Sequence, residues 1–227
     1  MVEDPAVALA AALERLYLVF RSYGLKPHIE GCPCCVYDED QDRVRSRSLR
    51  ALTAEDFDTY ASKALTTWGD ADDLRHFLPR LLELVTGSPG DFISNEIVLS
   101  KLATAGWRDW PAQEQEAVES VLSLRWNVGL THDPSEFDAG TWLCGAELAG
   151  SDVSGYIDAW RSSDAPTAFE HLAAFITSNP ELLTEGRLAN PFCLEESQVA
   201  QEMQAWVTAC LADADFQERL AGWYQGP

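Results

Sequence analysis

Three cysteines within four positions make the segment 28–35, His-Ile-Glu-Gly-Cys-Pro-Cys-Cys, the first candidate for chemistry. Thiolates and imidazoles are the ligands of tetrahedral zinc, so Cys32, Cys34 and Cys35 with His28 form a candidate zinc site. The spacing differs from a standard zinc knuckle, which has two residues between its sulfurs. A strained, reducible disulfide among these cysteines is the second interpretation. A turn whose thiols pack as small apolar groups is the third.

The other cysteines supply no second ligand pair, because Cys144, Cys193 and Cys210 are far apart in the sequence. The first residues are acidic, and charged residues interrupt the apolar run that follows, which argues against a signal or transit peptide. We therefore predict a cytoplasmic protein. In that compartment we expect all six cysteines to be thiols, metal ligands or redox groups rather than a disulfide framework.

A second candidate site surrounds His76. Asp72, Asp73 and His76 share one face of a predicted helix, because residues three and four apart are neighbours on a helix surface. A carboxylate–histidine pair there would coordinate a metal or transfer protons, so His76 joins the candidate metal ligands. The plainer interpretation is that Asp72 and Asp73 complement the positive end of the helix dipole, with a surface histidine beside them.

Two indoles mark the entry to another predicted helix, in the segment Gly-Trp107-Arg-Asp-Trp110-Pro. Tryptophan often anchors an interface, because its ring buries a large area while its N–H needs a partner. We therefore take Trp107 and Trp110, together with Asp72 and Asp73, as candidate partner-binding residues. The alternative is that the two indoles hold neighbouring helices together in the core.

Nearly every periodic segment of the chain predicts a helix, and period-two alternation typical of strands is almost absent. Capping patterns begin helices at Thr53 and Asp70. Pro79 lies inside the second of these and predicts a kink or a break. The predicted helices cover about residues 5–22, 53–67, 70–85, 94–104, 111–128, 136–148, 152–161, 165–178, 195–212 and 214–224.

The fold expected from this pattern is all-α, with about ten helices stacked as antiparallel pairs. An irregular helical bundle and a degenerate HEAT-like array both fit. We predict a single domain over residues 1–227, with one continuous core and two lobes that meet at a weak boundary near 129–135. The length of 227 residues leaves room for a sizeable core.

Charge excludes two classes of partner. The formal net charge is −21, whereas a protein that binds nucleic acid or an anionic membrane needs a basic surface. The charge is also uneven: residues 1–110 hold 12 basic and 18 acidic side chains, and residues 111–227 hold 4 and 19. An acidic C-terminal half is a surface that a basic protein partner could contact, although the plainer interpretation is a surface that keeps the protein soluble.

Four segments together resemble a family of uncharacterised bacterial proteins. They are Glu-Gly-Cys-Pro-Cys-Cys ending at Cys35, Lys-Ala-Leu-Thr-Thr-Trp-Gly-Asp ending at Asp70, the Arg-His-Phe-Leu-Pro-Arg run through His76, and Trp-Arg-Asp-Trp-Pro from Trp107. The resemblance covers about residues 28–125. It implies a bacterial cytoplasmic setting, and it carries no activity, cofactor or catalytic residue.

The missing catalytic constellation, the many helices and the acidic C-terminal half predict a non-enzymatic protein-interaction module. The alternative function is zinc binding or thiol redox chemistry at the Cys32–Cys35 cluster. No segment is long and apolar enough to predict a membrane span.

Overall fold

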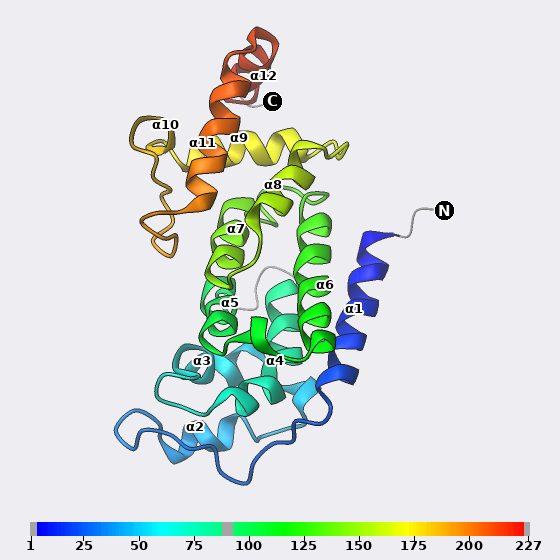
Figure 1. Ribbon diagram of the computed structural model, residues 1–227, viewed down its shortest axis with the longest axis vertical. Coiled ribbons are helices and arrows are strands. Elements are labelled where there is room, and N and C mark those ends of the chain that lie inside the picture. The colour runs from blue at the N-terminus through cyan, green and yellow to red at the C-terminus, as the bar shows by residue number, and fades with distance from the viewer. Residues whose placement is uncertain (1–3, 88–92, 225–227) are drawn as a thin grey trace. The chain divides into compact units, whose positions relative to one another are not determined.

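The computed structural model describes residues 4–87 and 93–224, which form twelve α-helices and two short 3-10 helices (Figure 1). No β-strand occurs among these residues. Two isolated β-bridges join Gly31 to Trp68 and Ala64 to Trp68. The prediction of an all-α fold is therefore confirmed.

The chain divides into two compact units, Met1–Arg125 and Trp126–Pro227. The division falls inside a helix, a few residues before the boundary that the sequence predicts near 129–135. The N-terminal unit contains the 3-10 helices η1 (Leu49–Ala51) and η2 (Trp107–Asp109) and the α-helices α1 (Pro5–Phe20), α2 (Asp38–Arg43), α3 (Ala54–Lys63), α4 (Ala71–Thr86), α5 (Asn95–Thr104) and the first part of α6 (Ala112–Gly129).

Reciprocal capping begins both helices that the capping patterns predict. The Thr53 side chain accepts a hydrogen bond from the Asp56 amide at the start of α3, and Asp70 does the same for Asp73 at the start of α4. Of the kink or break predicted at Pro79, the break does not occur, because α4 continues through Pro79 to Thr86. Burial of the apolar face of α4 stabilises the helix around the one lost backbone hydrogen bond.

The core of the N-terminal unit forms where α4 packs against α1, α3 and α5. Phe57, Tyr60 and Phe77 are fully buried there. Their rings meet edge to face, with centroids 5.4 Å apart for Phe57 and Phe77 and 4.6 Å apart for Tyr60 and Phe77. Trp68 joins this core to the cysteine segment, because its ring meets Tyr60 at 5.2 Å and its backbone bridges to Gly31.

The C-terminal unit contains the end of α6 and six further α-helices. Three indoles, those of Trp126, Trp142 and Trp160, are almost completely buried in its core. Its helices are α7 (Ala139–Leu148), α8 (Val153–Arg161), α9 (Ala168–Ser178), α10 (Leu182–Glu185), α11 (Gln198–Leu211) and α12 (Ala214–Tyr224). The central element is α11, which packs against α7, α8, α10 and α12 (Figure 1). The short α10 was not predicted from the sequence.

Within the residues that the structure describes, every helix is too short or too polar to span a lipid bilayer.

Candidate metal site

Three sulfur atoms gather on the loop between α1 and α2. The Sγ atoms of Cys32, Cys34 and Cys35 all lie within 4.8 Å of one another. The Sγ of Cys34 is 2.9 Å from that of Cys32 and 3.6 Å from that of Cys35. Zinc–sulfur bonds of about 2.3 Å at tetrahedral angles require sulfurs about 3.8 Å apart, so the Cys34–Cys35 separation is close to this spacing and the Cys32–Cys34 separation is shorter.

The cysteine loop is fastened to the turn that connects α3 to α4. The Cys32 amide donates to the Thr67 carbonyl over 2.8 Å, and the Gly69 amide donates to the Glu30 carbonyl over 2.7 Å. Gly69 has a φ of 74°, and a Cβ there would lie 3.1 Å from Asp73 and from Ile29. Glycine therefore allows the two segments to approach this closely.

Two side chains distant in the sequence hold the loop at its two ends. The Gln41 amide of α2 donates to the Ile29 carbonyl over 2.7 Å. The Lys63 ammonium, from the last residue of α3, donates to the Cys35 carbonyl. Ile29 is completely buried, so the apolar side chain before the cysteines anchors the loop while the thiols remain accessible. Sequence reasoning missed Gln41 and Lys63, because nothing in their local pattern points to a loop 12 or 28 residues away.

The sulfur–sulfur contacts also separate the acidities of two thiols. Hydrogen bonding with the Cys34 side chain lowers the pKa of Cys32. The hydrogen bond with the Cys32 side chain raises the pKa of Cys34 to about 11. Cys32 therefore loses its proton first, and its thiolate accepts hydrogen bonds from the neighbouring thiols. A cation bound by all three sulfurs would displace the remaining protons.

The two candidate histidines lie outside this group of sulfurs. His28 is exposed, and its ring nitrogens are not among the ligand atoms that gather within 4.8 Å. The Nδ1 atom of His76 lies 2.8 Å from the Tyr23 carbonyl oxygen, and its ring packs on Phe77. The structure thus joins the three cysteines and leaves both histidines apart from them.

The acidic residues before His76 interact with cations and with their own helix start. Lys26 bonds Asp70 at 2.6 Å and Asp73 at 3.0 Å, and the Lys26 ammonium lowers the pKa of Asp70 to about 2. Asp72 is exposed and pairs with Arg75 at 2.9 Å. Asp73 is only 4% exposed, so it has little surface to offer a partner. The described contacts include no carboxylate–histidine pair at His76, and capping is the interpretation that this geometry supports.

The two indoles proposed as partner anchors lie in the core instead. Trp107 is fully buried, and Trp110 is 5% exposed. The Trp110 ring meets Phe20 edge to face at 5.9 Å and lies beneath the Arg75 guanidinium at 4.3 Å. Their burial corrects the expectation of a tryptophan-bearing surface and agrees with the alternative interpretation, in which the two indoles hold neighbouring helices together in the core.

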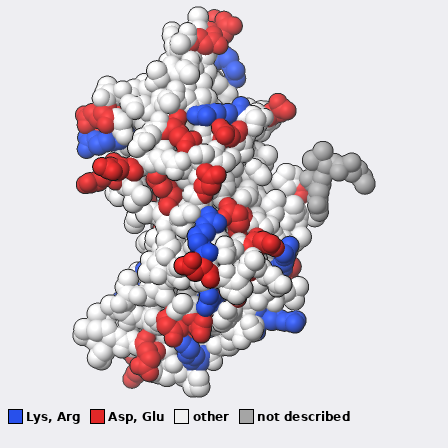
Figure 2. All heavy atoms as spheres, in the orientation of Figure 1, with Lys and Arg blue, Asp and Glu red and all other residues white. Residues whose placement is uncertain are grey.

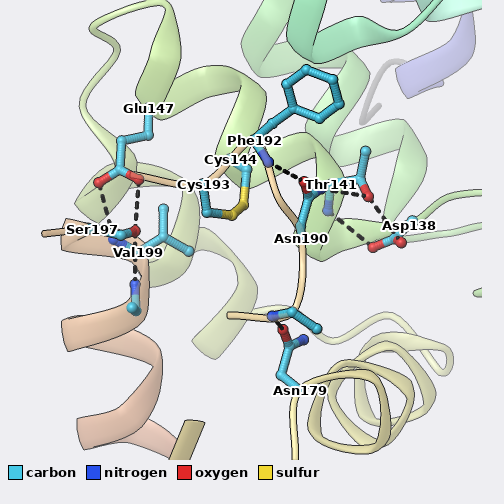
Figure 3. Close-up of a disulfide and its surroundings, with 12 residues drawn as sticks. Asp138, Thr141, Cys144, Glu147, Asn179, Asn190, Phe192, Cys193, Ser197 and Val199 are labelled. Atoms are coloured by element: carbon cyan, nitrogen blue, oxygen red, sulfur yellow. Dashed lines mark hydrogen bonds between the residues drawn. A yellow bond between two sulfur atoms is a disulfide. The ribbon is translucent and has the colours of Figure 1, made fainter. Parts of the chain in front are cut away.

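The C-terminal unit contains a cysteine pair of its own, which corrects the expectation that all six cysteines are thiols, metal ligands or redox groups. Cys144 on α7 and Cys193 form a disulfide (Figure 3). The chain between them turns back after α10, so residues 49 positions apart in sequence meet. Glu147, one helical turn beyond Cys144, accepts hydrogen bonds from Ser197 and from the first amides of α11 (Figure 3). The free cysteines in the described chain are those at positions 32, 34, 35 and 210.

Comparison of the chain with protein-family models, with curated proteins and with solved structures gives no match.

Proposed function

We propose that this protein binds a thiophilic metal ion, Zn²⁺ in the first place, through Cys32, Cys34 and Cys35. One observation carries the proposal: three sulfur atoms lie within 4.8 Å of one another on an accessible loop that is hydrogen-bonded at both ends. Soft thiolate ligands select Zn²⁺, Cu⁺ and iron–sulfur clusters over hard cations such as Mg²⁺. A loop already held in place also loses less conformational entropy when the metal binds.

The four free cysteines provide a matched test. Protein purified without chelator and dialysed against Zn²⁺ should contain about one zinc per chain by elemental analysis. Cys34→Ser should lose this zinc, whereas Cys210→Ser, which removes a free thiol on α11, should keep it. Circular dichroism of both variants checks that each one is folded.

A Cys34→Ser variant that is folded and still holds the wild-type amount of zinc contradicts the proposal. A second outcome also contradicts the proposal: the wild type contains no zinc, and mild oxidation removes the Cys32 and Cys34 thiols together. That outcome indicates the thiol-redox alternative instead. Replacement of Zn²⁺ by Co²⁺ adds a direct readout, because cobalt bound by thiolates absorbs in the near ultraviolet, and the loss of that band in Cys34→Ser identifies the ligands.

The second candidate is the non-enzymatic interaction module predicted from the sequence, with a basic protein as partner. The observation in its favour is that the C-terminal unit, with 16 acidic and 3 basic side chains, has little charge compensation of its own. Its basic residues are already engaged: Arg161 with Asp158, Arg187 with two glutamates, and Arg219 over the Phe169 ring. On the face in view in Figure 2, carboxylates are interspersed with basic groups rather than gathered in one patch.

Salt dependence tests this second candidate. A basic partner captured at low salt should be released at moderate salt, because screening weakens attraction between exposed charges. The absence of any salt-sensitive partner would count against it.

A cytoplasmic setting also stays a prediction, and the Cys144–Cys193 disulfide opposes it, because such bonds are rare in reducing compartments.

A further inference from the structure

A pocket of about 420 Å³ lies in the N-terminal unit between α1, α4 and residues 48–50. Its volume is within the range of pockets that hold small organic ligands. It is separate from the candidate metal site, because none of the three clustered cysteines lines it. It does include His76, the histidine that the sequence singled out.

Aromatic side chains form much of the pocket wall. The pocket is lined by Tyr17 and Phe20 of α1 and by Tyr23, which follows the end of α1. His76 of α4 also lines it. Each tyrosine hydroxyl is already engaged, Tyr17 with Glu83 at 2.6 Å and Tyr23 with Glu114 at 2.7 Å. The rings are thus held in place, and they favour a flat, apolar ligand body.

The charged groups of the pocket are all basic, in a chain whose formal charge is −21. Its lining includes two guanidinium groups and no carboxylate. Arg50 is fixed, because it donates to both oxygens of Glu14 at 2.7 and 2.8 Å and lies 3.7 Å over the Tyr17 ring. Arg21, at the C-terminal end of α1, has no ion-pair partner among the described residues. One positive charge therefore remains for an anion.

His76 adds a polar group of defined tautomer. A carbonyl oxygen only accepts hydrogen bonds, so Nδ1 of His76 carries a proton and its N–H donates a hydrogen bond to the Tyr23 carbonyl oxygen. In the neutral ring Nε2 is then an acceptor, and no described residue donates to it. The pocket thus combines aromatic walls, one available guanidinium and one acceptor nitrogen.

We propose that this pocket binds a small aromatic carboxylate, with its ring among the aromatic side chains and its carboxylate paired with Arg21. The aromatic walls select the ring, and the absence of acidic lining residues together with Arg21 selects the negative charge. The binding site does not depend on zinc at the cysteines, so the two proposals stand or fall separately.

The probe is 2-naphthoate, compared with its neutral analogue 2-naphthamide, by calorimetry and ligand-detected NMR at low salt. We expect naphthoate to bind with a Kd of about 1 mM or tighter, and the amide to bind about fivefold more weakly. Arg21→Gln should remove this preference by weakening naphthoate about fivefold while leaving the amide unchanged. Arg15→Gln, an equal change of charge on the same helix outside the pocket, should leave both affinities as they are.

A variant that fills the space separates a real pocket from a merely basic surface. Ser48→Trp places an indole at the pocket wall, and Ser48 makes no side-chain cap hydrogen bond, so the fold should tolerate the change. Binding of both probes should then disappear while the circular dichroism spectrum is retained. No binding to the wild type at 10 mM probe (about ten times the expected Kd), equal affinity for acid and amide, or unaltered binding to folded Ser48→Trp would overturn the proposal.

Discussion

Lys63→Met tests whether the hydrogen bond to the cysteine loop tunes metal affinity. The Lys63 ammonium donates to the Cys35 carbonyl, and methionine keeps an unbranched side chain of similar length while it removes the charge and the donor. If that bond positions the third sulfur, its loss should weaken Zn²⁺ binding without changing the ligand set. The three thiolates would remain, but the loop would spend more time in conformations that separate them.

The expected magnitude follows from the kind of bond that is lost. A hydrogen bond from a charged donor contributes about 1.5–3 kcal/mol when it is buried. Lys63 is half-buried and its bond is part-buried, so solvent screening reduces the contribution to about 1–2 kcal/mol. Since 1.4 kcal/mol corresponds to a factor of ten, Zn²⁺ affinity should fall about tenfold. This agrees with the 10- to 100-fold range typical of residues that orient metal ligands.

Competition with a chromophoric zinc chelator measures the affinity. Lys101→Met is the matched control, because Lys101 also donates to a backbone carbonyl, that of Ser62, over 2.8 Å and does not contact the cysteine loop. Urea unfolding of both variants separates a change in metal affinity from a change in stability. A Lys63→Met protein whose zinc affinity stays within twofold of the wild type, while Cys34→Ser loses zinc, would refute the positioning role.

Three further predictions concern the C-terminal unit. After removal of metal, the unfolded chain should show four reactive thiols without reductant and six with it; six in both cases would contradict the Cys144–Cys193 disulfide. Burial lowers the pKa of His171 from its usual value of 6.5. As the pH falls, the His171 ring is therefore protonated in the unfolded chain before it is protonated in the folded protein, and the free energy of unfolding should fall as the pH drops below about 6.5. Urea midpoints should fall less over this pH range in His171→Gln than in the wild type. Gly129→Ala would place a Cβ 2.5 Å from the Phe137 ring and should destabilise the protein by about 1–3 kcal/mol. Gly222→Ala has open space around the new Cβ and should stabilise the protein slightly. Thermal unfolding of the two variants measures both effects.

Local features of the structure were the ones that sequence reasoning predicted well. Capping residues and helical periodicity depend on neighbours within one or two turns, and the starts of α3 and α4 lie where Thr53 and Asp70 predict them. The clustering of three sulfurs is local as well, because chain connectivity keeps side chains two or three positions apart close together. The interpretation of His76 as a ligand also rested on local spacing, yet a carbonyl from Tyr23, 53 residues away, takes its Nδ1.

The sequence did not predict which distant segments contact one another. Periodicity predicts which face of a helix is buried but not against which partner, so the approach of Cys144 to Cys193 could not be derived. Core packing of Trp107 and Trp110 was one of two interpretations, and their burial decides between them. The fastening of the cysteine loop could not be derived either. The Glu-Gly-Cys-Pro-Cys-Cys and Leu-Thr-Thr-Trp-Gly-Asp segments lie side by side only because the turn before α4 returns to Gly31 through the Trp68 bridge.

The number of protein ligands predicts what removal of the metal will do. A structural zinc site has four protein ligands and its removal unfolds the domain, whereas a site with three keeps an open position. In the part of the chain that the structure describes, three cysteine sulfurs gather, and Cys34 among them is exposed. The surrounding helices also pack through buried apolar side chains such as Phe77, which do not depend on a bound metal. A chelator should therefore remove the zinc readily and leave the helical circular dichroism signal intact, and a loss of helicity on chelation would show that the site is structural.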